Sequence, residues 1–211
     1  MNKVKYGLEN VYYAPLERTQ GENGRVTVNY GTPKKLNGTV ELSLEQQGES
    51  EAFYADNIAY YNVDSNLGYE GTLTLALITD EFKKEIMGYV EDKNKVLFEN
   101  KDATFKPFAL MFEFKGDTKK TRHVLYNVNT SRGKVAGKTV ADKTEVETEE
   151  LSLKATPCEE TGMVKASCYE GTEQYNSWFS TVYKYVQPTE AEETKLNEEV
   201  RSIKPKNQEK K

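Results

Sequence analysis

The residue types that most often carry out catalysis are few in this sequence, and their spacing forms no catalytic arrangement. His123 is the single histidine, and it lies in a segment that alternates like a strand. No serine or cysteine has a second catalytic feature near it, and there is no G-x-S-x-G motif, which would place a nucleophile on a sharp turn. The 34 acidic residues allow many carboxylate pairs, but the sequence singles none out. We therefore expect no catalytic residue and no enzyme activity.

Residues 133–139 read G-K-V-A-G-K-T and come close to a phosphate-binding loop. Such a loop needs four residues between its two glycines, so that successive backbone N–H groups wrap the phosphates, and a helix follows it. Here three residues separate Gly133 from Gly137, and a strand-like pattern rich in Thr, Glu and Val follows. The sequence instead predicts a long, flexible basic loop at about residues 131–143.

Metal ligands are equally sparse, because a zinc site needs histidine, cysteine or carboxylate ligands at a recognisable spacing. Residues 64–68 begin like a calcium-binding loop but lack its bidentate glutamate. Cys158 and Cys168 could form a disulfide bond, yet residues 1–13 lack the apolar stretch of a secretion signal. We therefore expect both thiols to stay reduced, and we expect neither a metal nor a cofactor.

Composition and charge narrow the class of protein. The 211 residues give room for one large domain or two small ones. The net charge is −5, which argues against a dedicated nucleic-acid binder, because that class needs a basic surface to neutralise phosphates. No apolar run approaches the roughly 20 residues of a membrane-spanning helix, so we expect a soluble protein without a membrane partner.

The dominant hydrophobic period is two, which is typical of strands with one buried face. Alternating apolar residues occur at 40–44, 73–77, 108–114 and 124–128. In the third segment both alternating sets are apolar, which predicts a strand buried on both faces, and a polar hairpin at 116–120 joins it to the fourth. A further segment changes phase at Glu149 and Glu150, which predicts a β-bulge or a strand end.

One short helix is expected at about residues 80–88. Thr79 is a suitable N-cap, and the acidic residues after it suit the helix dipole. Phe82 and Ile86 lie one turn apart, and Gly88 ends the pattern. Many short strands around a single helix predict a mainly β fold, an antiparallel β-sandwich or barrel.

The two ends of the chain differ from this core. Residues 1–24 form an expected N-terminal arm, first strand-like and then polar and glycine-rich. The β pattern stops after residue 187, and residues 188–211 form a charged tail whose thin apolar stripe includes Leu196 and Val200. The tail is either a helical arm that folds against a neighbouring subunit or a solvated extension. We expect one β-sandwich domain at 1–187 followed by this tail.

The 14 tyrosines cluster in several places, and two interpretations stay open. Tyrosine is favoured at protein interfaces, because its ring buries area while its hydroxyl keeps a partner, but it also suits strands. The residues alone indicate a non-enzymatic, β-rich binding or assembly protein with extended arms. The competing class is a secreted or cell-surface β-sandwich module, such as a carbohydrate-binding one, which would bring a secretion signal and an exposed aromatic platform.

Several strings of residues resemble the major tail proteins, or tail tube proteins, of siphophages that infect Gram-positive bacteria. The opening string is K-V-K-Y-G-L-E-N-V-Y-Y-A-P-L, and the resemblance continues in the same order along the chain. The strings lie at residues 3–16, 67–73, 105–114, 123–127, 129–132, 138–139, 151–157 and 178–183. The resemblance spans about residues 1–186 and leaves the tail uncovered.

The resemblance implies a structural virion protein that forms hexameric rings, which stack into the tail tube that conducts DNA. It implies a β-sandwich flanked by a helix, without catalysis or a cofactor, and with DNA as transient, non-specific cargo. The implied partners are further copies of the chain, the tape-measure protein and the tail terminator protein. The chain would be made in the bacterial cytoplasm and end in the virion tail.

Two sets of residues are candidates for these roles. The first set is expected at contacts between subunits and comprises Tyr6, Tyr12, Tyr13, Arg132, Lys138, Trp178, Leu196 and Val200. The second set is expected to face the lumen, because an acidic wall repels phosphates, and comprises Glu41, Glu45, Glu145 and Glu147.

Overall fold

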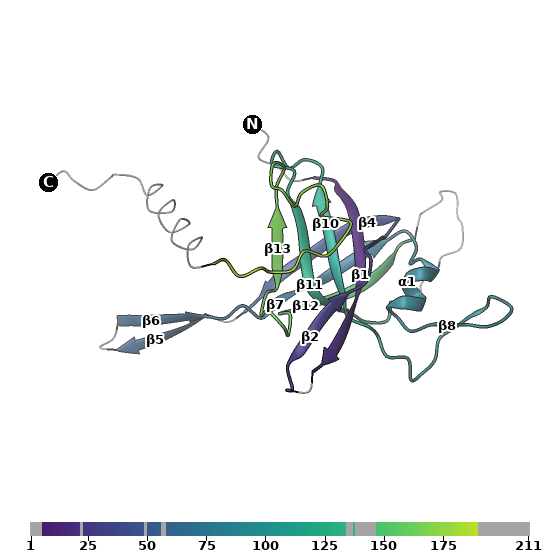
Figure 1. Cartoon of the computed structure of the whole chain (residues 1–211), viewed down its shortest axis with the longest axis horizontal. Coiled ribbons are helices and arrows are strands. Elements are labelled where there is room, and N and C mark those ends of the chain that lie inside the picture. Colours follow the sequence, from purple (N-terminus) through teal and green to yellow (C-terminus); the bar gives the residue numbers. More distant parts are fainter. Residues whose placement is uncertain are drawn as a thin grey trace.

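The computed structural model (Figure 1) describes residues 6–21, 23–48, 50–55, 58–133, 137 and 147–189, with the backbone alone described between 50 and 64. Several sequence predictions lie outside the described residues. These are the roles of Lys138, Glu145, Leu196 and Val200, most of the loop at 131–143, and the tail beyond Thr189.

The described elements are short strands interrupted by one helix. In chain order they are β1 (Leu8–Gln20), β2 (Val26–Tyr30), β3 (Lys34–Lys35), β4 (Thr39–Gln47), β5 (Ser50–Ala55), β6 (Ile58–Asp64), β7 (Gly68–Leu75), α1 (Asp80–Glu85), β8 (Val90–Glu91), β9 (Leu97–Phe98), β10 (Phe108–Phe114), β11 (Arg122–Thr130), β12 (Glu149–Thr156) and β13 (Lys165–Cys168).

Nine of these strands form one antiparallel sheet in the order β2-β1-β10-β11-β12-β7-β4, with β3 paired to β1 and β13 paired to β11. The pairs β5–β6 and β8–β9 form two separate ribbons, which project on opposite sides of the body in Figure 1. This architecture confirms the prediction of a mainly β, antiparallel fold with one short helix, and it is consistent with a β-sandwich.

Strand β10 lies at the centre of the structure and is buried on both faces, as its sequence predicts. Phe108 and Leu110 point into a first core, which the curled sheet encloses. Ala109 and Met111 point into a second core on the opposite face of the sheet. Because alternate side chains of a strand point to opposite faces, one uninterrupted apolar strand serves both cores.

Helix α1 covers one end of the first core. The ring of Phe82 packs edge-on against the rings of Tyr13 and Phe108, with centroids 4.9 and 5.5 Å apart. Thr79 caps the helix, because its hydroxyl oxygen accepts a hydrogen bond from the backbone N–H of Phe82 at 3.4 Å. The helix ends at Glu85, earlier than predicted, and Gly88 follows with a positive φ of 73°.

Two predicted strands are shorter or less regular than their sequence pattern indicated. The strand predicted at 73–77 ends at Leu75, and the side chain of Leu77 is exposed. Val40 is also exposed, although Leu42 and Leu44 turn inward as predicted. The reason is a shift of the β4–β7 register between Thr39 and Glu41, which takes Val40 out of the alternation.

Most of the expected N-terminal arm at residues 1–24 belongs to the sheet, in keeping with the strand-like pattern of its first part. Residues 8–20 form β1, which pairs with β10, β2 and β3 inside the sheet. Val11 and Leu16 are buried, which ties this strand to both cores. At the other predicted irregularity, β12 begins at Glu149, which confirms the strand-end alternative.

The second core is covered by residues 169–189, here called the C-terminal segment, which follows β13 without a regular helix or strand. Trp178 of this segment is buried there beside Tyr126, Cys158 and Cys168. Cys158 and Cys168 are both free and buried, and burial raises the pKa of Cys168. Among the described residues, no helix has the length and apolarity needed to cross a bilayer.

Buried tyrosines should make the fold sensitive to alkaline pH. Burial raises the pKa of Tyr126 to about 12, and burial also raises the pKa values of Tyr13 and Tyr30. A raised pKa in the folded state means that stability is complete below the unfolded value of about 10 and is lost as pH rises through the folded value. We expect the free energy of unfolding to fall by roughly 1.4 kcal/mol per pH unit for Tyr126 alone over this window.

Urea unfolding measured from neutral pH upwards checks this expectation, with Tyr126→Phe as the matched variant. The phenolic O–H of Tyr126 donates to the backbone carbonyl of Tyr183 at 2.8 Å, so its loss costs about 1 kcal/mol at neutral pH. Above about pH 10 the variant should lose stability less steeply than the natural chain. Equal slopes would show that Tyr126 does not carry the alkaline sensitivity.

Candidate assembly interface

The one histidine is a core residue. The ring of His123 lies between the rings of Phe112 and Phe114, with centroids 5.2 and 6.0 Å away. Its backbone carbonyl accepts a hydrogen bond from the indole N–H of Trp178 at 3.4 Å. Within the described residues, no group of three or more His, Cys, Asp or Glu side chains is placed to hold a metal ion. The candidate functional sites of this protein are therefore surfaces that could contact another chain.

The first of these surfaces is the edge of the sheet formed by β4. This nine-residue strand is the last in the sheet order, and among the described strands it pairs with β7 alone. Its outer edge thus presents backbone N–H and C=O groups that another chain can pair with. Such an edge is an aggregation hazard unless a partner covers it.

Strand β2 at the opposite end of the sheet order is protected. The backbone N–H of Val28 donates to the carboxylate of Glu160 at 2.9 Å, and the ammonium of Lys184 donates to the carbonyl of Val28. Glu160 and Lys184 also form an ion pair at 3.6 Å. Two charged side chains therefore occupy the hydrogen-bonding positions at the middle of β2, and the two ends of the sheet differ in their capacity to recruit a further strand.

A second surface is the outer face of β4, β7 and β12, called here the polar face. The registers bring three polar residues of each strand side by side: Glu41, Ser43 and Glu45 of β4, Glu70, Thr72 and Thr74 of β7, and Glu150, Ser152 and Lys154 of β12. The face carries four carboxylates and one ammonium group, which lies 2.7 Å from the carboxylate of Glu70. These nine residues are all polar, and the carboxylates make the face acidic.

Two of the four predicted lumen residues, Glu41 and Glu45, lie together on this polar face and are exposed. Glu147 is half-buried just before β12, and Glu145 is outside the described residues. Sequence reasoning missed Glu70 and Glu150. In the sequence, both residues alternate with the apolar residues of their strands, which predicts that they are exposed. Only the pairing register shows that they lie next to Glu41 and Glu45.

The residues predicted at subunit contacts fall into two groups. Tyr6 and Arg132 are exposed, and Arg132 forms an ion pair with Glu99 at 2.6 Å. Tyr13 and Trp178 are 1% and 3% exposed, so their own subunit covers them and their side chains are not available to a neighbour. Tyr12 is half-buried and stacks on Phe179 at 4.8 Å. Tyr13 and Trp178 fill the first and the second core of their own subunit.

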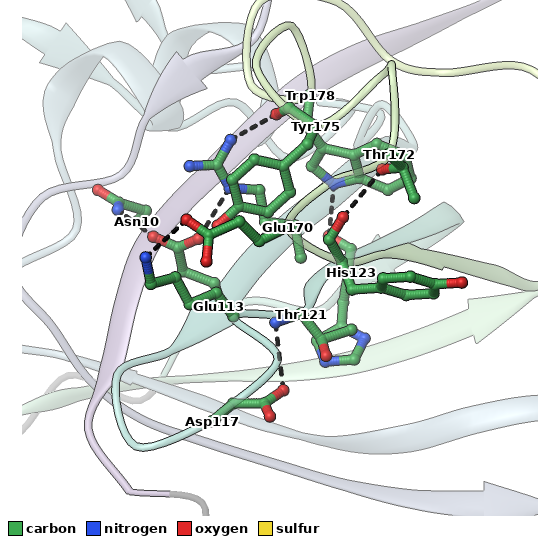
Figure 2. A network of polar contacts seen from close by, with 12 residues as sticks. Asn10, Glu113, Asp117, Thr121, His123, Glu170, Thr172, Tyr175 and Trp178 are labelled. Carbon is green, nitrogen blue, oxygen red and sulfur yellow. Dashed lines mark hydrogen bonds and ion pairs between the residues drawn. The ribbon is translucent and has the colours of Figure 1, made fainter.

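Arg122 holds the C-terminal segment against the sheet. Figure 2 shows Tyr175 of this segment near Glu113 of β10. The guanidinium of Arg122 lies 3.8 Å from the ring centroid of Tyr175 and 4.8 Å from that of Phe179. Its Nε forms an ion pair with Glu113 at 2.9 Å, and its Nη1 donates to the carbonyl of Tyr175 at 2.5 Å. Glu113 also accepts a hydrogen bond from the amide of Asn10. A single side chain thereby links β1, β10 and β11 to the segment that closes the second core.

Comparison with known proteins gives one family match. A family model described as phage tail tube protein matches residues 1–129, which is more than half of the chain. A search of curated proteins finds no match. The match favours a structural role in the tail and gives no support to a carbohydrate-binding module. The chain therefore belongs to the phage tail tube protein family, whose members build the tube of the virion tail.

Proposed function

We propose that the chain assembles head to tail into hexameric rings, that the rings stack into a tube, and that the polar face lines the lumen. The observation that carries this proposal is that the acidic polar face lies directly beside the open edge of β4. Pairing at that edge extends the sheet from one subunit to the next, so polar faces of successive subunits join into one continuous wall.

The difference between the two ends of the sheet gives this pairing a direction. A ring closes through one repeated heterologous contact, in which different surfaces of neighbouring subunits meet. The open β4 edge supplies one of these surfaces. The β2 edge, with Val28 capped by Glu160 and Lys184, is disfavoured as its partner. The exposed residues Tyr6 and Arg132 are candidates for further contacts between subunits. The tail at 188–211 is a candidate for contacts between rings.

An acidic lumen suits a conduit that DNA must leave quickly. Carboxylates at Glu41, Glu45 and Glu150 repel phosphates within the screening distance of about 8 Å at physiological salt. The nine residues of the polar face also offer no apolar side chain on which bases could stack. DNA is then transient cargo without a binding site. The tape-measure protein and the tail terminator protein are proposed to set the length and the end of the tube.

Charge reversal on the polar face tests its position. Tubes assembled from the Glu41→Lys, Glu45→Lys double variant in the presence of double-stranded DNA should retain nuclease-resistant DNA, at least about tenfold more than natural tubes, because the wall then attracts phosphates. The measurement is the amount of DNA that survives nuclease treatment of sedimented tubes, with electron microscopy to confirm the tubes.

The matched control is Glu17→Lys, Glu173→Lys, which changes the net charge equally at two other exposed positions. DNA bound outside the tube remains open to nuclease, so this control should protect none. Equal protection in both double variants would contradict a lumenal polar face. A natural chain that stays monomeric at every concentration, by light scattering and microscopy, would contradict the assembly itself.

A further inference from the structure

The β8–β9 ribbon is a rigid projection with one apolar face. Val90 lies directly opposite Phe98 in the ribbon, and Val96 lies at the end of the turn that precedes β9. These three side chains are 58%, 53% and 49% exposed. Within the described part of the chain, this ribbon therefore holds three large apolar side chains in water, on a projection remote from the main sheet (Figure 1).

The ribbon is held in shape by its own turn and by its base. The carboxylate of Asp92 accepts hydrogen bonds from the backbone N–H groups of Asn94 and Val96 at 2.8 and 2.9 Å. At the base, Lys84 of α1 forms an ion pair with Glu91 at 2.6 Å, and Tyr89 donates to Glu99 at 3.1 Å. Because the backbone and the base are fixed, binding through the apolar face would lose little conformational entropy.

The sandwich has a complementary hollow at the end that α1 leaves open. Helix α1 packs at Phe108, the start of β10, whereas an apolar cavity of about 210 Å³ lies at the end of the same strand. Its apolar lining is Leu42, Leu44, Tyr69, Phe112, Phe114 and Leu125, and Lys165, whose ammonium lies 5.5 Å from the ring centroid of Tyr69, completes it. An apolar cavity of about 150 Å³ already accepts a benzene molecule, so this hollow has room for a phenyl ring.

A second copy of the chain is the occupant that these features favour. Leu42 and Leu44 belong to β4, so the hollow is continuous with the edge at which the proposed function places the neighbouring subunit. The ribbon and the hollow lie toward opposite ends of β10, which spans roughly 20 Å. A projection at one end and a hollow at the other cannot meet within one rigid subunit, whereas a head-to-tail contact joins different surfaces of two subunits and can bring them together.

We propose that the β8–β9 ribbon of one subunit inserts Phe98 into the open apolar end of the sandwich of a neighbouring subunit. This inference rests on the proposed function, because it needs a second copy at the β4 side. Val90 and Val96 pack around the mouth of the hollow in this contact. Phe98 is the central anchor, of the kind that dominates the affinity of protein interfaces.

Phe98→Ser tests the anchor, and Tyr169→Ser is the matched control, because Tyr169 is 56% exposed and lies far along the chain in the loop after β13. We expect the protein concentration needed for tube formation to rise about tenfold or more for Phe98→Ser and to change less than about twofold for the control. Thermal unfolding of both monomers should match that of the natural chain, and Val90→Ser provides a second, milder variant.

A cysteine pair tests the contact directly. Chains with Phe98→Cys are mixed with chains with Leu44→Cys under mild oxidation, and we expect a covalent heterodimer, whereas Tyr169→Cys mixed with Leu44→Cys should give none. The native thiols are buried, which limits their interference. Tubes that form from Phe98→Ser at the natural concentration, or tubes of mixed Phe98→Cys and Leu44→Cys chains in which the pair does not link, would overturn this inference while leaving the proposed function intact. If the hollow is instead filled by a segment of its own chain or by a small apolar ligand, Phe98→Ser should form tubes normally and the cysteine pair should not link. A natural chain that never assembles would overturn both.

Discussion

Arg122→Ala is expected to destabilise the fold by about 3–5 kcal/mol, because it removes one partner of a largely buried ion pair. The side chains of Arg122 and Glu113 are 19% and 14% exposed, so the variant would leave Glu113 without its ionic partner in a poorly solvated place. The variant also loses the stacking of the guanidinium on Tyr175 and Phe179. Urea unfolding gives the change in free energy, and limited proteolysis should cleave the C-terminal segment first.

Two further variants separate the causes of this loss. Arg122→Lys keeps the charge but not the planar group that stacks on Tyr175, so it should recover only part of the stability. Arg122→Ala combined with Glu113→Gln removes the stranded charge and should be more stable than Arg122→Ala alone. If the double variant is no better than the single one, the ion pair is not the main contribution. If Arg122→Lys equals the natural chain, the stacking has no measurable role.

Gly68→Ala is expected to lower the melting temperature by about 6–12 °C, which corresponds to about 3 kcal/mol at roughly 2–4 °C per kcal/mol for a chain of this size. Gly68 begins β7 with a φ of 116°, which side chains with a Cβ rarely adopt. A Cβ there would also lie 1.9 Å from the backbone carbonyl oxygen of Ala155, so the β7–β12 pairing must shift. Backbone strain alone costs on the order of 1–3 kcal/mol.

Gly162→Ala is the control that isolates the steric part. Gly162 also has a positive φ, of 70°, but nothing lies within 4 Å of the position of its Cβ. Its substitution should cost only the left-handed strain of about 1–2 kcal/mol. Differential scanning calorimetry compares the two variants. Equal melting temperatures would show that β12 accommodates a side chain at Gly68 and that the close approach to Ala155 is not a constraint.

The sequence predicts the local elements well, because their signals are local. Apolar alternation and the burial of β10 on both faces follow from period two, and the start of α1 follows from Thr79 as an N-cap. Pairing is different, because it joins residues far apart in the chain. The polar face needs the β4–β7 and β7–β12 registers before Glu41, Glu70 and Glu150 can be placed together.

The covering of the second core could not be predicted for a related reason. The alternation in β10 indicates that another segment must cover Met111. The C-terminal segment has no helical or strand-like apolar pattern, so its sequence does not identify it as that covering segment. Trp178 and Tyr13 are large aromatic residues, a type that is common both in cores and at interfaces, so the sequence alone does not tell which of the two they occupy. Contacts made by the folded chain decide between the two, and they place both residues inside.

The cap on β2 also has a consequence for the synthesis of the chain. Val28 emerges from the ribosome early, whereas Lys184 follows it by 156 residues. During translation the β2 edge therefore stays uncovered until nearly the whole chain has been made. A fragment released before Lys184 lacks half of this cap and leaves both ends of its sheet open. We expect such a fragment to aggregate, because open strand edges pair with one another.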